Sequence, residues 1–296
     1  MAVAPLKIDL RRVRKEFARS RDGALVVLEG IDLELEALSF TSVIGASGSG
    51  KTTLLQLIAG LQFPTSGEVI VDAVPVKGPG RDRAVVFQDD AIFPWRTVLG
   101  NVEYGLSLRR MSKAERRQRA QEFIRLVGLT GFEEYYPYQL SGGMKKRVAL
   151  AEVLAVRPNV LLLDEPFGAL DYVTRRQLQE ELVQIWQSQE LTSVMVTHDI
   201  EEALYLSDRI VVLRDAKLHR DLIVPFSRPR VEGMRKSPEF VELKEKLWED
   251  IGAGGPSGPG EPGLEAHQAE SSRSVRASVQ RDLEGPTTTR GPAWPR

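Results

Sequence analysis

A glycine-rich segment that ends in lysine and threonine carries the clearest chemistry in the chain. Residues 45–52, GASGSGKT, match the pattern G-x-x-x-x-G-K-[ST]. Glycines let backbone amides turn toward an anion, Lys51 is expected to reach the β- and γ-phosphates, and Thr52 to place its hydroxyl on Mg²⁺. The apolar run 40–44 precedes the segment and a helical pattern follows it, as the motif requires. The segment predicts a nucleoside triphosphate site, which many unrelated enzymes share.

Two carboxylates follow another apolar strand pattern, over residues 160–163. They belong to Asp164 and Glu165. Because ligands of open parallel sheets bind at the carboxyl ends of the strands, Asp164 is placed to hold Mg²⁺, directly or through a water molecule. Glu165 is the candidate that orients and polarises an attacking water. A solvated acidic turn is the alternative, and the phosphate segment argues against it.

A histidine follows a third apolar strand pattern, over residues 193–196. His198 is one of three histidines in the chain. Taken alone, a histidine at a strand end is more often structural than catalytic. The neighbouring motifs reverse that preference and predict that His198 senses the γ-phosphate and helps to hold the water.

A second helix start suited to anions occurs at residues 140–144, LSGGM, before a basic helical pattern. Ser141 and the two glycines after it can form such a helix N-terminus. If one chain binds one nucleotide at residues 45–52, a second phosphate-binding helix start has no ligand within the same chain. We therefore expect this segment to serve a nucleotide held by another copy. A flexible loop capped by Ser141 is the alternative.

Strand and helix patterns alternate over residues 1–250 and must position these side chains. Continuous apolar strands between helices indicate an α/β fold with a mostly parallel sheet that is covered on both faces. Strands before Phe40 are not separated by helices and predict an antiparallel layer at one edge. The predicted strands are 26–35, 40–44, 69–71, 85–87, 160–163, 193–196 and 210–213, and the predicted helices are 52–61, 113–127, 144–155, 172–187 and 200–206.

The domain organisation follows from composition. Residues 1–250 are expected to form one domain, with an α-helical subdomain at about 98–155 inside it. Residues 251–296 are rich in glycine and proline and hold few large apolar residues, so we expect a disordered tail.

Charge and hydropathy exclude several function classes. The formal net charge of −1 does not indicate a nucleic-acid binder, and the absence of cysteine removes disulfides, thiolate metal sites and cysteine nucleophiles. No secretory signal is evident at the start, and no apolar run is long enough to cross a bilayer. If the protein serves a membrane, it does so through a partner.

Over roughly residues 6–250 the chain resembles the nucleotide-binding subunit of ABC transporters. Six motifs stand in the family's order: residues 45–52 (Walker A), Gln88 (Q-loop), 140–144 (signature), 161–165 (Walker B), 168–171 (D-loop) and His198 (switch). The resemblance implies a P-loop NTPase core, hydrolysis of ATP with Mg²⁺, and a head-to-tail pair of subunits. In that pair each ATP lies between one copy's Walker A and the other copy's signature segment.

The resemblance also assigns residue roles. Phe17 occupies the place of the aromatic that stacks on adenine, although ordinary core packing is an alternative for it. Catalysis is assigned to Glu165, His198 and Gln88, and Mg²⁺ binding to Thr52, Gln88 and Asp164. The residues implied in nucleotide binding are Phe17, Gly45, Ala46, Ser47, Gly48, Ser49, Gly50, Lys51, Thr52, Thr53, Ser141, Gly142, Gly143 and Asp171.

Residues 94–98, PWRTV, and Met144 resemble the branch of importers for nitrate, sulfonates, taurine and bicarbonate. This implies integral-membrane permease subunits, an external solute-binding protein and a peripheral place on the cytoplasmic face of the membrane. The region 98–136 and the Gln88 loop would form the permease groove, with Phe93 and Trp95 in that contact or in the core. A soluble ABC-type ATPase in a non-transport assembly is the alternative, but neither a coiled-coil insertion nor a second cassette is present.

Three positions depart from the family pattern. Leu38-Ser39 replaces the usual Gly-Glu, which strains the turn if it needs a positive φ. Ala46 replaces a common proline. Glu152 stands where relatives usually have arginine, which reverses a charge that we expect to lie near the site.

Overall fold

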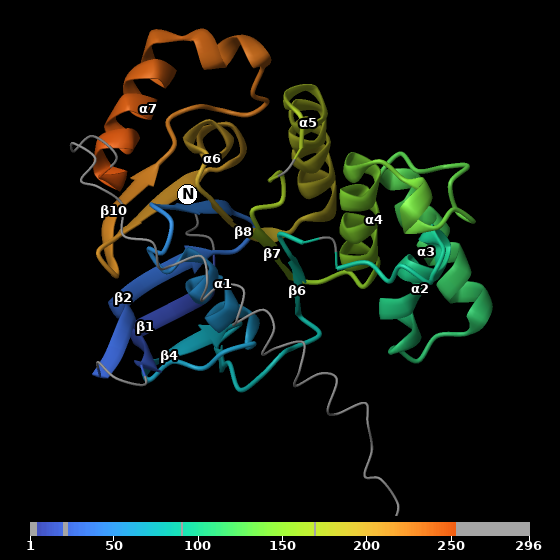
Figure 1. Cartoon of the computed structure of the whole chain (residues 1–296), viewed down its shortest axis with the longest axis horizontal. Coiled ribbons are helices and arrows are strands. Elements are labelled where there is room, and N and C mark those ends of the chain that lie inside the picture. The colour runs from blue at the N-terminus through green and yellow to red at the C-terminus, as the bar shows by residue number, and fades with distance from the viewer. Residues whose placement is uncertain (1–4, 20–22, 90, 169, 253–296) are drawn as a thin grey trace, which may run out of the picture. The chain divides into compact units, whose positions relative to one another are not determined.

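The computed structural model describes residues 5–19, 23–89, 91–168 and 170–252, and Figure 1 shows the arrangement of its elements. The described residues belong to one compact unit. Ala169 of the D-loop and the predicted tail beyond Gly252 lie outside the described residues. The disorder of the tail and the predicted domain boundaries therefore remain predictions.

A six-stranded sheet forms the centre of the fold, and five of its strands are parallel. The order is β10-β9-β3-β8-β7-β6, with β10 antiparallel to β9. Strands β3, β7 and β8 are buried along their whole length, as expected for parallel strands covered on both faces. The mostly parallel sheet is thus confirmed. The strands are β3 (Phe40–Ile44), β6 (Arg83–Val86), β7 (Val160–Asp164), β8 (Thr192–Thr197), β9 (Arg209–Arg214) and β10 (Lys217–Ile223).

The register of this sheet brings three strand ends to one edge. Ile44 of β3 pairs with Thr197 of β8, and Asp164 of β7 pairs with Val196 of β8. The glycine-rich segment, the acidic pair and the switch histidine each begin at one of these ends. Neighbouring strands lie about 4.8 Å apart, so segments distant in sequence start close together in space.

A four-stranded sheet forms the predicted antiparallel layer. Its order is β2-β1-β4-β5, and every pairing in it is antiparallel. Apolar residues of this sheet, of helix α1 (Lys51–Ala59) and of the central sheet share one buried cluster, so α1 packs against both sheets. The strands are β1 (Leu6–Arg19), β2 (Gly23–Glu36), β4 (Ser66–Val71) and β5 (Val74–Pro75).

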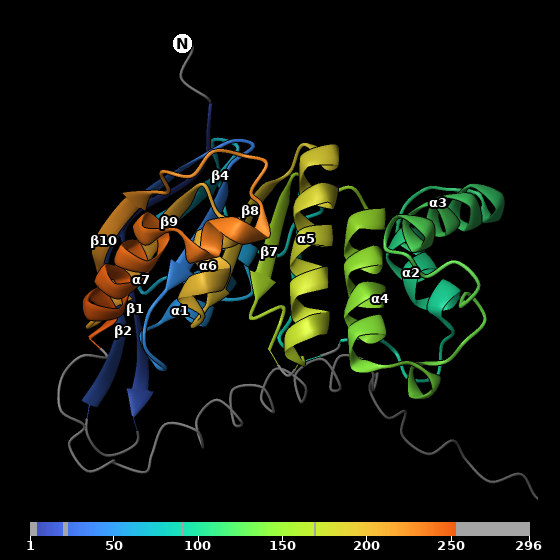
Figure 2. The same ribbon diagram turned by 90° about the horizontal axis from the view of Figure 1, so that it is seen from above.

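Helices cover the other face of the central sheet. Helix α5 (Tyr172–Gln189) packs there with the helical subdomain in one buried cluster, in which the Trp186 ring meets the edge of Phe40 at 5.6 Å between centroids. Helices α6 (Ile200–Leu206) and α7 (Pro238–Ile251) share a smaller cluster with β3 and β9. Figure 2 shows α5 beside β7, and α6 and α7 together further along the sheet.

The predicted helical subdomain contains α2 (Val98–Ser107), α3 (Lys113–Leu126) and α4 (Gly142–Ala155). Each helix starts at a side chain that accepts a hydrogen bond from the first turn, namely Thr97, Ser112 and Ser141. Ser112 and Glu115 form a reciprocal capping box at α3. Such caps satisfy the free amides of a helix start and explain where these helices begin.

Strands β1, β5 and β10 and helix α7 had no counterpart among the predicted segments. Strand β1 alternates charged and apolar residues irregularly, because bulges shift its register at four points against β2. Strand β10 has only alternating half-buried positions at the edge of the sheet. Helix α7 buries only Phe240 and Leu247, which is too sparse a pattern to identify a helix.

Two arginines mark the end of α6. Arg228 donates to the carbonyl of Leu206, and Arg230 donates to the carbonyls of Leu204 at 3.1 Å and Tyr205 at 2.9 Å. Basic side chains at a helix C-terminus satisfy its last carbonyls and complement the helix dipole. The segment 228–230 therefore has a structural role.

The turn between β2 and β3 has the strain expected from its departure from the family pattern. Leu38 has a φ of +61°, and its amide donates to Thr192 Oγ1 at 3.0 Å. Its side chain is 57% exposed, so packing offers little compensation. A left-handed leucine costs about 1–2 kcal/mol relative to glycine.

We therefore expect Leu38→Gly to raise the free energy of unfolding by about 1 kcal/mol, because glycine adopts this φ without a steric penalty. Urea denaturation of the purified protein measures the change. Leu38→Ala keeps the Cβ atom and is the matched control, expected to gain nothing. A glycine variant no more stable than the alanine variant would contradict the strain.

Glu152 lies near the end of α4 rather than at its start beside Ser141. The helix there packs on α2, where a Cβ at Gly105 would come 3.9 Å from the Glu152 carbonyl oxygen. Burial raises the pKa of the Glu152 carboxyl to about 7, and the positive charge of Arg96 opposes this shift only in part. The reversed charge therefore lies inside the helical subdomain, away from the helix start that was expected to bind phosphate.

The Glu152 carboxyl is neutral in the folded protein up to a pH of about 7, whereas in the unfolded chain it ionises at a pH of about 4.3. The neutral carboxyl therefore contributes its full stability to the fold below about pH 4.3, and this contribution is lost as the pH rises through 7. We expect Glu152→Gln to be more stable than the wild type by roughly 3 kcal/mol at pH 8.5. At pH 4.5 the two proteins should be equal. Denaturant unfolding across this range tests the sign, with exposed Glu134→Gln as control; a gain that does not depend on pH would contradict it.

Candidate functional site

Glycines in the segment 45–50 meet steric demands that no other residue satisfies. Gly50 has a φ of +99°, and a Cβ there would lie 2.7 Å from the Val27 carbonyl oxygen of β2. A Cβ at Gly45 would lie 2.3 Å from the Leu213 carbonyl oxygen of β9. Gly48 has a φ of +80°. The loop is therefore wedged between both sheets in a conformation that exposes its backbone.

The start of α1 has free capacity for an anion. Among the α-helices in the described residues, α1 alone has no side-chain cap, and its N-cap is Gly50. The first-turn amides, including those of Thr52 and Thr53, therefore lack a side-chain acceptor. Ser49 Oγ is buried without a hydrogen-bond partner. This orphaned hydroxyl and the uncapped helix start fit a phosphate group.

The Lys51 side chain folds back onto the glycine-rich loop. Its ammonium donates to the carbonyls of Gly45 and Ala46, both at 2.9 Å. Burial lowers the pKa of Lys51, while the negative charges of Glu165 and Asp164 oppose that shift. A buried cation whose donors are directed at the loop is suited to bind phosphate oxygens.

The predicted metal ligands Thr52 and Asp164 lie in contact. Thr52 Oγ1 donates to Asp164 Oδ1 at 3.1 Å. Burial raises the pKa of Asp164 to about 6, an effect that the hydrogen bond from Thr52 partly offsets. One hydroxyl and one carboxylate fit Mg²⁺, which usually takes one or two protein oxygens and completes its shell with phosphates and waters. Accordingly, the described residues hold no cluster of three or more His, Cys, Asp or Glu side chains suited to a metal.

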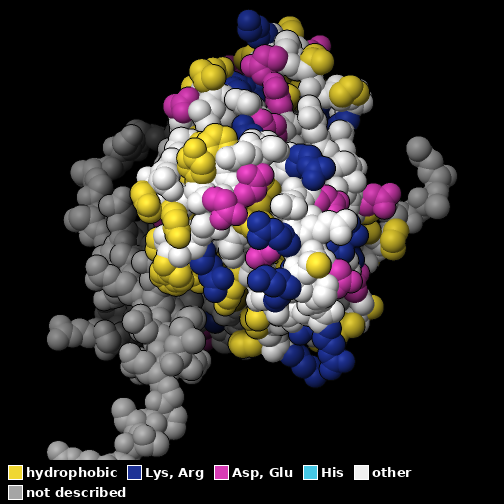
Figure 3. All heavy atoms as spheres, turned by 90° about the vertical axis from the view of Figure 1, so that its right-hand side faces the viewer, with side chains coloured by type: hydrophobic (Ala, Val, Ile, Leu, Met, Phe, Trp, Pro, Cys, Tyr) yellow, Lys and Arg dark blue, Asp and Glu magenta, His cyan; other side chains and the backbone are white. Residues whose placement is uncertain are grey.

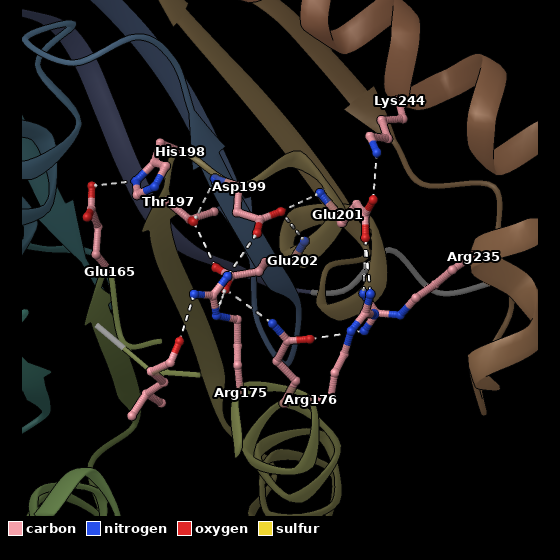
Figure 4. Close-up of polar contacts among 12 residues, drawn as sticks. Glu165, Arg175, Arg176, Thr197, His198, Asp199, Glu201, Glu202, Arg235 and Lys244 are labelled. Atoms are coloured by element: carbon pink, nitrogen blue, oxygen red, sulfur yellow. Dashed lines mark hydrogen bonds and ion pairs between the residues drawn. The ribbon is translucent and has the colours of Figure 1, made fainter. Parts of the chain in front are cut away.

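Glu165 lies between the other two predicted catalytic residues. Gln88 Nε2 donates to Glu165 Oε2 at 3.1 Å, and His198 Nδ1 lies 3.2 Å from Glu165 Oε1 (Figure 4 shows the contact with His198). Glu165 has a φ of +44°, and its amide donates to the Val196 carbonyl at 3.0 Å. Strained backbone of this kind is concentrated at functional sites. The structure thus assembles the three residues from three separate segments.

The signature residues do not join this cluster. Ser141 caps α4 by accepting from the Met144 amide at 3.3 Å, and Ser141 and Gly142 are exposed. In both ribbon views β7 and α5 lie between α1 and α4 (Figures 1 and 2). An exposed helix start far from the loop of its own chain is available to a second molecule.

Asp171 and Phe17 lie at the margins of the site. Asp171 caps α5 by accepting from the amides of Val173 and Thr174, and the hydrogen bonds from Thr174 hold the pKa of Asp171 below its usual value. Phe17 is partly exposed on β1, opposite Leu25 of β2, and the Lys15 ammonium lies 4.9 Å from its ring centroid.

Three contributors were missed from the sequence. Lys146 of α4 donates to the Gln88 carbonyl and so connects the signature helix to the Q-loop. Asn101 is fully buried and bonds to the backbone of Phe93, Arg96 and Thr97. Glu202 accepts from Thr197 beside the switch histidine. Lys146 and Asn101 lie outside the motifs, and their partners are backbone groups that leave no trace in residue type.

Known proteins share this arrangement. The chain is 45% identical over 247 residues to the nitrate import ATP-binding protein NrtD of a Synechocystis species, covering 81% of this chain and 91% of the relative. It is 47% identical over 247 residues to the taurine import ATP-binding protein TauB of Pseudomonas putida, covering 81% and 93%. The chain belongs to the ATP-binding subunits of ABC transporters. Residues 28–168 match the model of the family described as ABC transporter.

As a member of this family the chain is an ATPase of the importer type. An ABC transporter ATP-binding protein of Methanocaldococcus jannaschii is 52% identical over 222 residues, covering 74% of this chain and 82% of the relative. The dimeric cassette MJ0796 in a post-hydrolysis state with ADP and phosphate matches with a TM-score of 0.67 and 34% identity, over 74% of this chain and all of that one. The P-loop NTPase fold is thereby confirmed.

None of the described helices combines the length and the hydrophobicity that crossing a bilayer requires.

We expect Glu165→Gln to lower the rate of ATP hydrolysis by several orders of magnitude and to leave ATP bound between two copies, because the amide cannot polarise the attacking water. Release of labelled phosphate measures the rate, and light scattering with ATP measures the dimer. Glu68→Gln, at an exposed carboxylate of β4, is the control. Hydrolysis near the wild-type rate in Glu165→Gln would remove Glu165 from the reaction.

Proposed function

We propose that this chain energises an ABC importer for a small anion or an organosulfur or nitrogen-containing solute, such as nitrate, a sulfonate or taurine. The observation that carries the proposal is the convergence of Lys51, the Thr52–Asp164 pair and the Glu165 cluster at one sheet edge. The relatives named for nitrate and taurine import support the class of solute. No observation favours the alternative of a soluble non-transport assembly.

In this proposal the loop and the first turn of α1 bind the phosphates of ATP. The glycines expose backbone amides, Ser49 and Thr53 add donors, and Lys51 transfers its hydrogen bonds from the loop carbonyls to phosphate oxygens. Phe17 would stack on the adenine, since its ring is partly exposed on β1. Thr52, Asp164 and Gln88 would hold Mg²⁺, which when bound neutralises charge on the phosphates.

Hydrolysis then depends on the Glu165 carboxylate. Its side chain is only 21% exposed, and Gln88 and His198 bind one oxygen each. A carboxylate held in this way can accept a hydrogen bond from water and draw a proton as the water attacks. We assign to His198 the second contact to this water and to the γ-phosphate.

A second copy would complete the nucleotide site. Ser141 and Gly142 present an exposed helix start that the chain does not direct at its own loop, and the buried Gly143 follows them in the first turn of α4. The dimeric structures of MJ0796 support a pair of subunits. In a head-to-tail pair the signature residues of one copy face the ATP of the other, and Asp171 lies close to the seam.

The permease would dock on the aromatic segment that leads into the helical subdomain. Trp95 is 71% exposed, and its ring lies 5.5 Å from that of Phe93, which in turn packs on Tyr104 at 4.6 Å. Exposed tryptophans on a fixed backbone are frequent anchors of protein interfaces. Figure 3, which views the molecule from the side of the helical subdomain, shows exposed hydrophobic side chains among charged ones. We place this surface on the cytoplasmic face of the membrane, against the permease.

Uptake of labelled nitrate, taurine and an alkanesulfonate in the source organism tests this function. Deletion of the gene should abolish uptake of one of the three solutes. Trp95→Ala should reduce that uptake about tenfold or more, as for loss of an interface anchor, while Trp248→Ala, another exposed tryptophan, should not. Undiminished uptake of all three solutes after deletion would contradict the proposed solute class.

A further inference from the structure

The backbone on both sides of the switch histidine is held by one buried hydroxyl. Thr197 Oγ1 donates to Glu202 Oε2 at 2.9 Å and accepts from the Asp199 amide at 3.0 Å. His198 stands between Thr197 and Asp199 in the sequence, and Figure 4 shows its ring directed toward Glu165. Its side chain is 65% exposed, so packing does little to fix the imidazole. The position of the ring relative to Glu165 therefore depends on the backbone of residues 197–199.

Glu202 is the buried end of this contact. Only 5% of the residue is exposed, and its other oxygen accepts from Gln179 Nε2 at 3.2 Å, with Arg175 Nε at 3.9 Å. Burial and the charge of Asp199 raise the pKa of Glu202 to about 7, while the hydrogen bond from Thr197 and the charges of Arg175 and His198 oppose the shift. A buried carboxyl held from two sides is a rigid anchor for the Thr197 hydroxyl.

The anchor is supported in turn by the segment that precedes α7. Gln179 is 1% exposed, and its oxygen accepts from Arg235 Nη2 at 3.0 Å. Arg235 belongs to the short 3-10 helix η2 (Glu232–Lys236), and its guanidinium lies 3.9 Å from the centroid of the Tyr205 ring. The side chain of Arg235 is 6% exposed. Thr197, Glu202, Gln179 and Arg235 thus form one continuous buried chain of hydrogen bonds.

A second contact joins the same regions nearer the surface. Glu201, next to Glu202 on α6, accepts from Lys244 of α7 at 2.6 Å and from Arg176 of α5 at 3.2 Å. The C-terminal segment is therefore joined to α6 directly at Glu201 and, through Gln179 of α5, indirectly at Glu202. Displacement of this segment would act on the backbone of α6 immediately after the switch histidine.

We propose that Glu202 is a positioning residue for His198, which holds the switch backbone through Thr197 and is itself supported by Arg235 through Gln179. The proposal rests on the role assigned to His198 in the proposed function. Removal of the Glu202 carboxyl frees the Thr197 hydroxyl and lets the imidazole move away from Glu165. Binding of ATP uses the loop at residues 45–52 and does not require this chain of hydrogen bonds.

A double-mutant cycle with His198 tests the proposal. We expect Glu202→Ala to lower kcat about tenfold with KM for ATP unchanged within about twofold. In the His198→Ala background the same substitution should change kcat less than about twofold, because it acts through a side chain that is no longer there. Single-turnover hydrolysis of labelled ATP gives access to the low rates. An equal fall in both backgrounds would overturn the proposal.

Two further variants separate positioning from stability. Glu202→Gln keeps an acceptor for Thr197 and should restore kcat to within about threefold of the wild type. Thr197→Val keeps the shape of the side chain and removes only the hydroxyl, so it carries the test should Glu202→Ala fail to fold. It should lower kcat as Glu202→Ala does, again only when His198 is present. Wild-type kcat in Thr197→Val would overturn the proposal.

Arg235→Met tests the outer part of the chain. The variant keeps an apolar stem against Tyr205 but removes the donor to Gln179. We expect kcat to fall about threefold, again only in the presence of His198. Wild-type kcat would remove the C-terminal segment from the proposal. If the wild-type protein itself fails to hydrolyse ATP, the proposed function fails; additive effects in an active protein contradict this inference alone.

Discussion

The register of the parallel strands is the constraint on which the site depends. Because Ile44 lies opposite Thr197 and Asp164 opposite Val196, three loops leave the sheet at nearly the same height. A shift of one residue in any of these pairings would turn that strand's side chains to the opposite face. The complete burial of β3, β7 and β8 makes such a shift costly. The apolar core thus fixes the distances within the proposed site without contributing a side chain to it.

The presence or absence of a side-chain N-cap distinguishes the helix at the proposed phosphate site from the other helices. Most helices of the described chain begin at a serine, threonine or aspartate that satisfies the first-turn amides. Helix α1 begins at a glycine instead, and the carbonyl oxygens of Val27 and Leu213 leave no room for a Cβ at Gly50 and Gly45. A side-chain cap would add roughly a few tenths of a kcal/mol over this glycine, and α1 lacks it at the position where we propose that an anion binds. The missing cap therefore distinguishes the start of α1, where we propose phosphate binding, from the capped starts of the other described α-helices.

Sequence patterns predicted the central sheet, the antiparallel layer and the proximity of Gln88, Glu165 and His198, because these depend on local apolar runs and on side chains of distinctive type. Lys51, Asp164 and Glu165 each follow a buried strand, and strand ends in a parallel sheet must meet. The sequence could not predict β1, whose bulges break its alternation, or α7, which buries two residues. Nor could it predict that Glu202 bonds to Thr197 or that Asn101 bonds to the backbone of three residues in the segment 93–97, since such contacts depend on the folded path of the chain.

Asn101 has a consequence for association. Its amide bonds to Phe93, Arg96 and Thr97 at 2.7–3.2 Å fix the backbone that carries Trp95 before any partner is present. Ordering a mobile loop on binding costs roughly 1–2 kcal/mol of conformational entropy for each residue that becomes fixed. This chain meets that cost during its own folding, so a partner that docks on Trp95 keeps more of the contact energy as affinity. A buried asparagine can therefore strengthen an interface that it never touches.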